Sequence, residues 1–215
     1  MGLKQSLAIG FACMLILALL RNNRYRFRLL KIVLLTALMV FFGVIGTMIM
    51  FYIENGRWGG TSFYGAVFMI PISFYLLSKV GLDEYGVITD YCAIPICIML
   101  AVMKFRCIFQ GCCGGRVLFE NAIGKKVVFP SQIMECITII MVMILLIYCE
   151  GKGTYKNKIY PLFLVLYGST RFILNSFRTG LHPLLVILPA GHFWSIVAIA
   201  VGYYLLKRRD TNRPK

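Results

Sequence analysis

The stretch Tyr160–Phe177 reads YPLFLVLYGSTRFILNSF, and Arg171 lies in the middle of it, with Arg178 one residue beyond its end. A helix needs roughly 20 largely apolar residues to cross a bilayer, and this stretch comes close to that length. An arginine inside a span costs about 2.5–3.5 kcal/mol on insertion scales and usually faces the interior of a helix bundle at a functional path or site. The stretch therefore predicts a membrane helix in which Arg171 is a candidate anion-binding residue.

The rest of the 215-residue chain is similarly apolar. It is 60% hydrophobic and only 14% charged, with a mean hydropathy of +0.80, whereas soluble domains are roughly 25% charged. The long apolar blocks predict an all-α, polytopic integral membrane protein with one transmembrane domain over residues 1–215 and about seven spans. The predicted spans are Gln5–Leu20, Leu29–Ile53, Thr61–Leu77, Tyr85–Met103, Ser131–Tyr148, Ile159–Phe177 and Leu184–Leu206.

The basic residues, which give a formal net charge of +15, lie mainly between and after the apolar blocks. Residues 21–31 and residues 207–215 each hold five of them. Cytoplasmic loops are rich in lysine and arginine, so we expect the N-terminus outside and the C-terminus inside, with these two segments against anionic headgroups. This distribution argues against a nucleic-acid partner. The first span lacks a small-residue cleavage site, so we expect an anchor rather than a signal peptide.

Four polar groups interrupt the spans, and we expect all of them on the outer side of the bundle. They are Gly59–Gly65, which includes Gly60, Ser62 and Tyr64; Asp90, with Lys104 and Arg106 at the far end of its span; Pro130–Glu135, which includes Gln132; and Gly191, His192 and Ser195. Each group also has a structural interpretation. These are an interfacial tyrosine with packing glycines, an ion pair, a shallow carboxylate and a hydrogen-bonded histidine.

A polar stripe surrounds Arg171 on its own helix. Tyr167, Arg171, Asn175 and Arg178 are spaced 4, 4 and 3 residues apart, and therefore share one helix face. Guanidinium groups bind phosphate and carboxylate in bidentate fashion. The stripe is consistent with a site for a lipid phosphate, or with a buried pair between Arg171 and either Glu135 or Asp90.

The eight cysteines do not form a disulfide framework, because several lie inside predicted spans. The exception is Cys107-x4-Cys112-Cys113, in a predicted exterior loop over residues 104–130. An oxidising exterior permits a disulfide between Cys107 and one of the other two, since adjacent cysteines pair only under strain. Zinc would need a fourth ligand at conventional spacing, so we predict no metal or cofactor.

Taken in order, these motifs resemble bacterial prolipoprotein diacylglyceryl transferases over about residues 58–195. The segment Trp58–Gly65 is similar to D-G-G-x-S-F-H-G-G, and Asp90 with Met103–Gly115 matches the spacing of an aspartate to G-R-x-G-N-F-x-x-G-E-x-x-G. Further along the chain, Pro130–Glu135 resembles H-P-S-Q-L-Y-E, Tyr167–Arg178 resembles Y-G-x-x-R-F/I-x-x-E-x-x-R, and Gly191–Ser195 resembles G-Q-x-x-S.

The resemblance implies an enzyme of the bacterial cytoplasmic membrane. Such an enzyme transfers a diacylglyceryl group from phosphatidylglycerol to the lipobox cysteine of a prolipoprotein signal peptide and releases glycerol phosphate. The resemblance also implies that Arg171 and Lys104 act on the phosphate and that Tyr64 or His192 helps to deprotonate the thiol. The implied substrate-binding residues are Gly60, Ser62, Asp90, Arg106, Gly115, Gln132, Glu135, Tyr167, Asn175 and Arg178.

The sequence also departs from the family pattern. The family's histidine, arginine, asparagine, glutamate and glutamine are replaced by Tyr64, Lys104, Cys107, Asn175 and His192, unless Arg106 takes the place of the arginine from half a turn away. Two alternatives therefore stand beside the transferase. One is a divergent relative that binds phospholipid or transfers another group. The other is a membrane thiol oxidoreductase that uses Cys107, Cys112 and Cys113.

Overall fold

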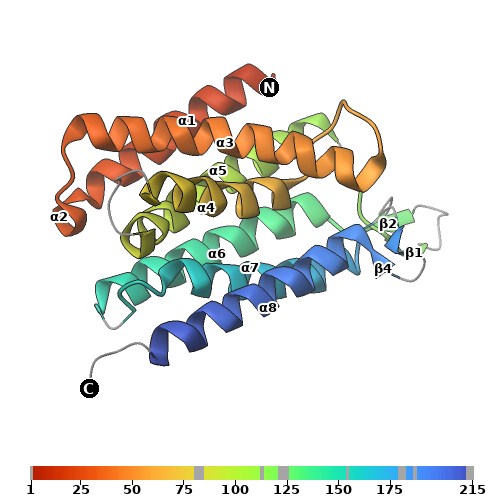
Figure 1. Cartoon of the computed structure of the whole chain (residues 1–215). Helices are drawn as coiled ribbons and strands as arrows, with labels where there is room; N and C mark the ends of the chain where they lie inside the picture. Colours follow the sequence, from red (N-terminus) through yellow and green to blue (C-terminus); the bar gives the residue numbers. More distant parts are fainter. Residues whose placement is uncertain are drawn as a thin grey trace.

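A computed structural model describes residues 2–79, 85–111, 114–120, 126–153, 155–178, 183–185 and 188–211. Long helices run roughly side by side along one bundle (Figure 1). They are α1 (Leu3–Leu20), α3 (Leu29–Asn55), α4 (Phe63–Lys79), α5 (Tyr85–Gln110), α6 (Ser131–Gly151), α7 (Ile159–Asn175) and α8 (Ala190–Thr211), with a short α2 (Asn22–Tyr25) between the first two. Each predicted span corresponds to one long helix, and the all-α class is confirmed.

Two short antiparallel strand pairs lie in the connections. β1 (Val117–Glu120) pairs with β2 (Lys126–Val128), and β3 (Pro183–Leu185) pairs with β4 (Leu188–Pro189). Two predicted boundaries are wrong. α5 continues to Gln110, so residues 104–110 are helical rather than part of a loop. α8 begins at Ala190 rather than Leu184, consistent with Pro189 having no N–H to donate within a helix.

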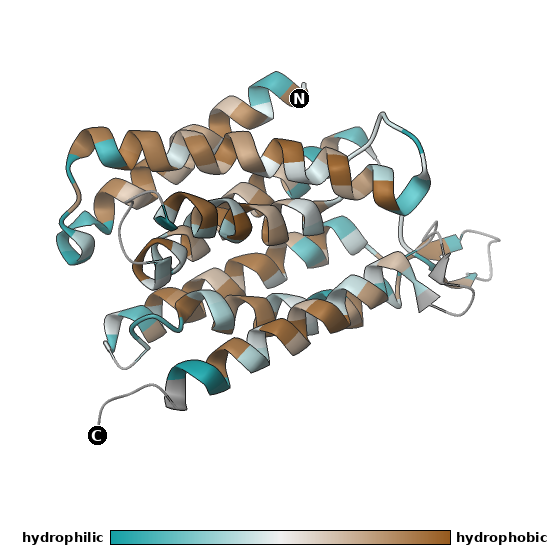
Figure 2. Cartoon of the chain, in the orientation of Figure 1, coloured by the Kyte–Doolittle hydropathy of each residue, from teal (hydrophilic) through white to brown (hydrophobic). Residues whose placement is uncertain are grey.

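The chain is a multi-pass membrane protein. Among the described residues, α1, α3, α5 and α6 are long and apolar enough to cross a membrane. α4 and α7 have 17 residues each and so are about 26 Å long, slightly less than a hydrocarbon core of roughly 30 Å. Apolar residues dominate the middle of the bundle and hydrophilic residues its two ends (Figure 2). The number of seven crossings stays a prediction.

Successive long helices run in opposite directions, which gives the bundle two distinct ends (Figure 1). The N-terminus, β1 and β2 lie at one end, here called the hairpin end. α2 and the C-terminus lie at the other, here called the tail end. The predicted orientation would place the hairpin end outside the cell and the tail end inside.

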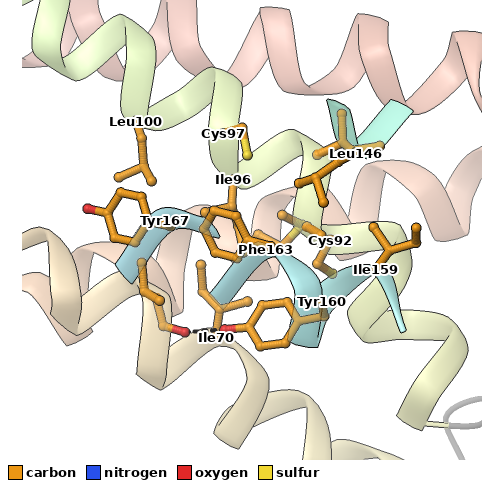
Figure 3. Close-up of a cluster of buried hydrophobic side chains, with 14 of the residues drawn as sticks. Ile70, Cys92, Ile96, Cys97, Leu100, Leu146, Ile159, Tyr160, Phe163 and Tyr167 are labelled. Carbon is orange, nitrogen blue, oxygen red and sulfur yellow. Dashed lines mark hydrogen bonds between the residues drawn. The ribbon is translucent and has the colours of Figure 1, made fainter. Parts of the chain in front are cut away.

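Two prolines inside helices leave backbone carbonyls without their helical N–H partner, and side chains from other elements supply one. Pro71 frees the carbonyl of Val67, which accepts a hydrogen bond from the Tyr160 hydroxyl in the apolar core (Figure 3). Pro95 frees the carbonyl of Tyr91, which accepts from Arg21 at 2.9 Å. A related contact lies at the entry to α7, where the carbonyl of Asn157, just before the helix, accepts from Arg209. Because backbone groups inside a bilayer must be satisfied internally, these contacts fix how the helices meet.

The contact between α3 and α4 sets the position of Tyr64. Gly46 and Gly65 pack so closely that a Cβ on either would overlap the backbone of the other. Just before α4, the Ser62 amide donates to the Thr47 carbonyl at 3.0 Å. The entry to α4 is thereby held against α3, and Tyr64 is directed into the bundle, where it is 2% exposed.

Candidate active site

A buried ionic cluster lies at the hairpin end, where α5, α6 and α7 meet. Oε1 of Glu135 is 2.7 Å from Nη1 of Arg171 and 3.5 Å from Nη1 of Arg178, and Oε2 of Glu135 pairs with Nζ of Lys104. All four side chains are at most 14% exposed. The predicted pairing of Arg171 with Glu135 is therefore present. One carboxylate nevertheless faces three cations, and the cluster has two positive charges in excess.

A cavity of about 200 Å³ opens onto these cations. It forms where α3, α5 and α7 end and α4 and α8 begin, so five of the long helices contribute to its lining. Its lining residues are Phe51, Glu54, Asn55, Thr61, Ser62, Phe63, Tyr64, Lys104, Arg171, Asn175, Arg178, Ala190 and Gly191. Lysine and arginine beside hydroxyl and amide groups make this lining suitable for an oxyanion.

Tyr64 has a defined hydrogen-bond partner beside the cavity. Its hydroxyl lies 2.5 Å from Oγ of Ser195, and that Oγ lies 2.7 Å from the carbonyl of Gly191. The single Ser195 proton satisfies the Gly191 carbonyl, so the Tyr64 hydroxyl is the donor in the first contact. Nδ2 of Asn175 also donates to Ser195, at 3.4 Å. This arrangement gives Tyr64 a positioning role and engages the proton it would have to lose to act as a base.

The predicted stripe faces the cluster, but α7 ends at Asn175, so Arg178 follows the helix rather than lying on it as predicted. Tyr167 and Asn175 are 4% and 1% exposed, and Arg171 is 7% exposed. In the described part of the chain, the Tyr167 hydroxyl and Nε of Arg171 have no hydrogen-bond partner. Buried polar atoms are normally satisfied. The unpartnered atoms of Tyr167 and Arg171 are therefore available to form hydrogen bonds with a ligand.

Asp90 does not belong to this site, and its predicted place on the outer side is wrong. Its Oδ1 accepts from the Tyr160 amide at 3.1 Å and lies 3.8 Å from Nη1 of Arg209. Arg209 is at the far end of α8, about 27 Å from Gly191 at 1.5 Å per residue. α5 begins at the tail end, so an aspartate in its second turn lies there. It holds the first turn of α7, a helix N-terminus that attracts negative charge.

Arg106 and His192 also lie apart from the cavity. Arg106 follows Lys104 by two residues and so projects to the other side of α5, and it is absent from the lining. Lys104 is thus the residue of this motif that meets Glu135. Nε2 of His192 lies 3.3 Å from Oγ of Ser176, and the ring packs edge-on against Phe172. The structure does not bring His192 to the cations.

The predicted glycines have packing functions at the rim. A Cβ on Gly60 would overlap the Phe51 ring, and one on Gly115 would overlap the Phe129 carbonyl. Gly115 also forms an antiparallel bridge with Arg178, which joins the base of the β1–β2 hairpin to the end of α7. Gln132 is half-buried in the first turn of α6, one turn before Glu135.

The cysteine cluster is only partly described. Cys107 is 6% exposed and lies on α5 rather than in a loop. Cys112 and Cys113 lie outside the described residues, so the predicted disulfide stays untested. The other cavity residue of note is Glu54, which the sequence interpretation did not select. Its Oε1 accepts from the Ser62 hydroxyl at 2.7 Å. The available signal was a single acidic residue at the end of a long apolar span.

Comparison with known proteins gives two matches. A sequence model of the prolipoprotein diacylglyceryl transferase family matches residues 2–208. The phosphatidylglycerol–prolipoprotein diacylglyceryl transferase of Clostridium tetani (strain Massachusetts / E88) is 23% identical over 156 residues. That alignment covers 68% of this chain and 63% of the relative, so the chain spans less than two thirds of the relative's length.

Proposed function

The chain belongs to the prolipoprotein diacylglyceryl transferase family, and from this premise we propose that it transfers a diacylglyceryl group from phosphatidylglycerol to the thiol of a lipobox cysteine. Glycerol phosphate is the second product. The reaction takes place in the bacterial cytoplasmic membrane, and the acceptor peptide reaches the cavity from the hairpin end. The observation that carries the proposal is the cation excess around Glu135.

The size of that excess supports a phosphate leaving group. The phosphodiester of phosphatidylglycerol carries one negative charge, whereas a phosphomonoester carries about −1.5 to −2 at pH 7. Three cations and one carboxylate leave a local charge of +2. Such a site stabilises the leaving group more than the bound substrate, and only that difference accelerates the reaction.

A second cavity supports an amphiphilic substrate. It has a volume of about 60 Å³, lies among α1, α3, α4 and α5, and has an almost entirely apolar lining that includes Met39, Gly43 and Ile96. Thr61 and Phe63 line both this cavity and the polar one. A phospholipid with its phosphate at the cations can place hydrocarbon in the adjoining apolar space.

The proposed chemistry is a single displacement. The deprotonated cysteine sulfur attacks the glyceryl carbon that carries the phosphate oxygen. A carbon–sulfur bond forms as the carbon–oxygen bond breaks, and the oxygen leaves with the electron pair as glycerol phosphate. Arg171, Arg178 and Lys104 hold that oxyanion. Glu135 keeps the three cations in place before the substrate arrives, which is the preorganisation that makes such sites effective.

Purified protein should therefore add the mass of a diacylglyceryl group to a lipobox peptide when phosphatidylglycerol is supplied. Restored growth of a transferase-depleted bacterium would support the same conclusion. The matched variants are Arg171→Lys, which removes a bidentate guanidinium group from the cluster, and Arg106→Lys, which makes the same change outside the cluster. Absence of product from the wild-type chain, under conditions where another family member works, removes the proposal.

The partial counter-charge from Glu135 and the engaged Tyr64 hydroxyl also favour a second candidate, a relative that binds phospholipid without turnover. The cations have a counter-charge at rest, and the Tyr64 hydroxyl is engaged with Ser195. Native mass spectrometry distinguishes the candidates. A tightly held phospholipid, together with no peptide product, supports the binding protein.

A further inference from the structure

We propose that Glu54 is the proton acceptor for the incoming cysteine thiol, an assignment that rests on the proposed transferase function. Glu54 lines the same cavity as Arg171 and Lys104. It sits in the last turn of α3, at the hairpin end, and is half-buried. A thiol must become a thiolate to act as a nucleophile, so the cavity must contain a group that accepts its proton.

The other carboxylates, and the two side chains that the family resemblance implied as bases, are engaged elsewhere or lie away from the cavity. Glu135 is surrounded by three cations, and both of its oxygens are in ion pairs. The Tyr64 hydroxyl lies against Ser195, and His192 lies against Ser176 outside the lining. Asp90 is at the tail end. Among the described residues that line the cavity, Glu54 is the carboxylate not held in an ion pair.

The hydrogen bonding of Glu54 suits a base. The Ser62 hydroxyl donates to Oε1 at 2.7 Å and fixes the orientation of the carboxylate. Within the described part of the chain, Oε2 has no hydrogen-bond partner and no lysine or arginine forms an ion pair with the group. A general base needs an open acceptor atom within hydrogen-bond reach of the proton it removes. A half-buried oxygen at the rim offers that to a thiol that enters from the hairpin end.

Proton transfer to Glu54 also matches the charge change of the reaction. Counting Glu54 and Glu135 against Lys104, Arg171 and Arg178, the resting site carries +1, equal and opposite to a phosphodiester. When Glu54 takes the thiol proton, the site carries +2, as the leaving group becomes a phosphomonoester with a charge near −2. The sulfur–hydrogen bond breaks, the proton goes to Oε2, and the sulfur electron pair forms the new carbon–sulfur bond.

The test compares two acceptor peptides that are identical except that one has selenocysteine in place of the lipobox cysteine. A selenol is already ionised at neutral pH and needs no base. Glu54→Gln keeps the size and hydrogen bonding of the side chain, and Glu120→Gln on the exposed β1 strand is the matched control. We expect Glu54→Gln to lower kcat with the cysteine peptide by about 10²-fold or more, the usual contribution of a general base. With the selenocysteine peptide, kcat should stay within about threefold of wild type.

Each outcome is decisive. A loss of similar size with both peptides assigns Glu54 a structural role and overturns the proposal. Unchanged activity with the cysteine peptide shows that another group takes the proton. If wild-type protein makes no product with either peptide, the transferase function itself fails and this assignment with it. Thermal unfolding in detergent verifies that the variants fold. Ser62→Ala, which frees Oε1, should have a smaller effect than Glu54→Gln, and the opposite order contradicts the assignment.

Discussion

The two ends of the bundle each contain a buried ionic cluster, and the clusters differ in how their charges are used. At the tail end, Glu150 binds Arg21 at 2.5 Å and accepts from the Tyr25 hydroxyl, also at 2.5 Å. Burial raises the pKa of Tyr25, with a smaller opposing effect from Arg21, so the hydroxyl remains a proton donor to Glu150. Asp90 holds the start of α7. At the hairpin end, three cations share Glu135 and face a cavity.

The difference shows that residue types alone do not distinguish an ionic cluster that stabilises the fold from one that binds a substrate. Arg21 also donates to the carbonyl that Pro95 leaves free, and Arg209 donates to the carbonyl of Asn157 ahead of α7, so their hydrogen bonds serve the fold. A cavity of about 380 Å³ borders this end too, but its charged lining is balanced, with Arg24 and Lys156 against Asp90 and Glu150. The lining of the hairpin-end cavity instead has surplus positive charge, with Lys104, Arg171 and Arg178 against Glu54, as an anion-binding site requires.

The largest effect should follow from the loss of Arg171. Arg171→Ala should lower kcat/KM for diacylglyceryl transfer by about 10³-fold, because a preorganised oxyanion donor is worth that much. Stability should change little, since Lys104 and Arg178 still accompany Glu135 and no buried carboxylate is left unpaired. Rates and melting curves on the same detergent preparation check this. A variant that unfolds, or one that keeps its activity, would place this cluster with the tail end as a structural device.

The opposite result, a loss of stability with an unchanged transfer rate, is expected at the tail end. Glu150→Gln should destabilise the protein by about 3 kcal/mol, because Arg21 remains buried without its counter-charge. The transfer rate per folded molecule should stay within about twofold of wild type, since Glu150 lies nearly a helix length from the cations. Unfolding and single-turnover rates measured on one sample separate the two quantities. A selective loss of rate would break the comparison by giving the tail end a part in the chemistry.

Two variants on α5 test which of its basic residues, Lys104 or Arg106, acts on the substrate. Lys104→Ala should lower kcat by about 10²-fold, since it removes one of three charges on the leaving group. Arg106→Ala, two residues away and outside the cavity lining, should stay within about twofold. The same transfer assay measures both. Equal losses would mean that Arg106 reaches the substrate when it binds.

The sequence predicts the hairpin end of the bundle better than the tail end. The apolar blocks predicted every long helix, because hydropathy reports burial in lipid directly. The i, i+4 spacing on α7 predicted the stripe at Arg171. The pairing with Glu135 was one of two options that the spacing left open. Asp90 was misplaced even though alternating span directions put it at the tail end.

Other features depend on contacts between distant segments. The hydrogen bond from Ser62 to Glu54 joins the end of one helix to the approach of the next, and no periodicity indicates it. The partners of the carbonyls freed by Pro71 and Pro95 come from α7 and from the end of α1. A proline in the sequence indicates that a carbonyl is free, but the bundle decides which side chain meets it.

The smallest effect is expected at His192, and it sharpens the boundary of the hairpin-end site. His192→Gln should leave kcat within about twofold of wild type, because the ring lies against Ser176 and Phe172 rather than on the cavity, and an amide can keep the bond to Ser176. The pH–rate profile tests directly whether His192 is the base. If His192 were the thiol base, the wild-type profile would have a limb near the usual histidine pKa of about 6.5 that the variant lacks. Superimposable profiles would exclude His192 as the thiol base and would agree with the assignment of Glu54, which lines the cavity beside the cations.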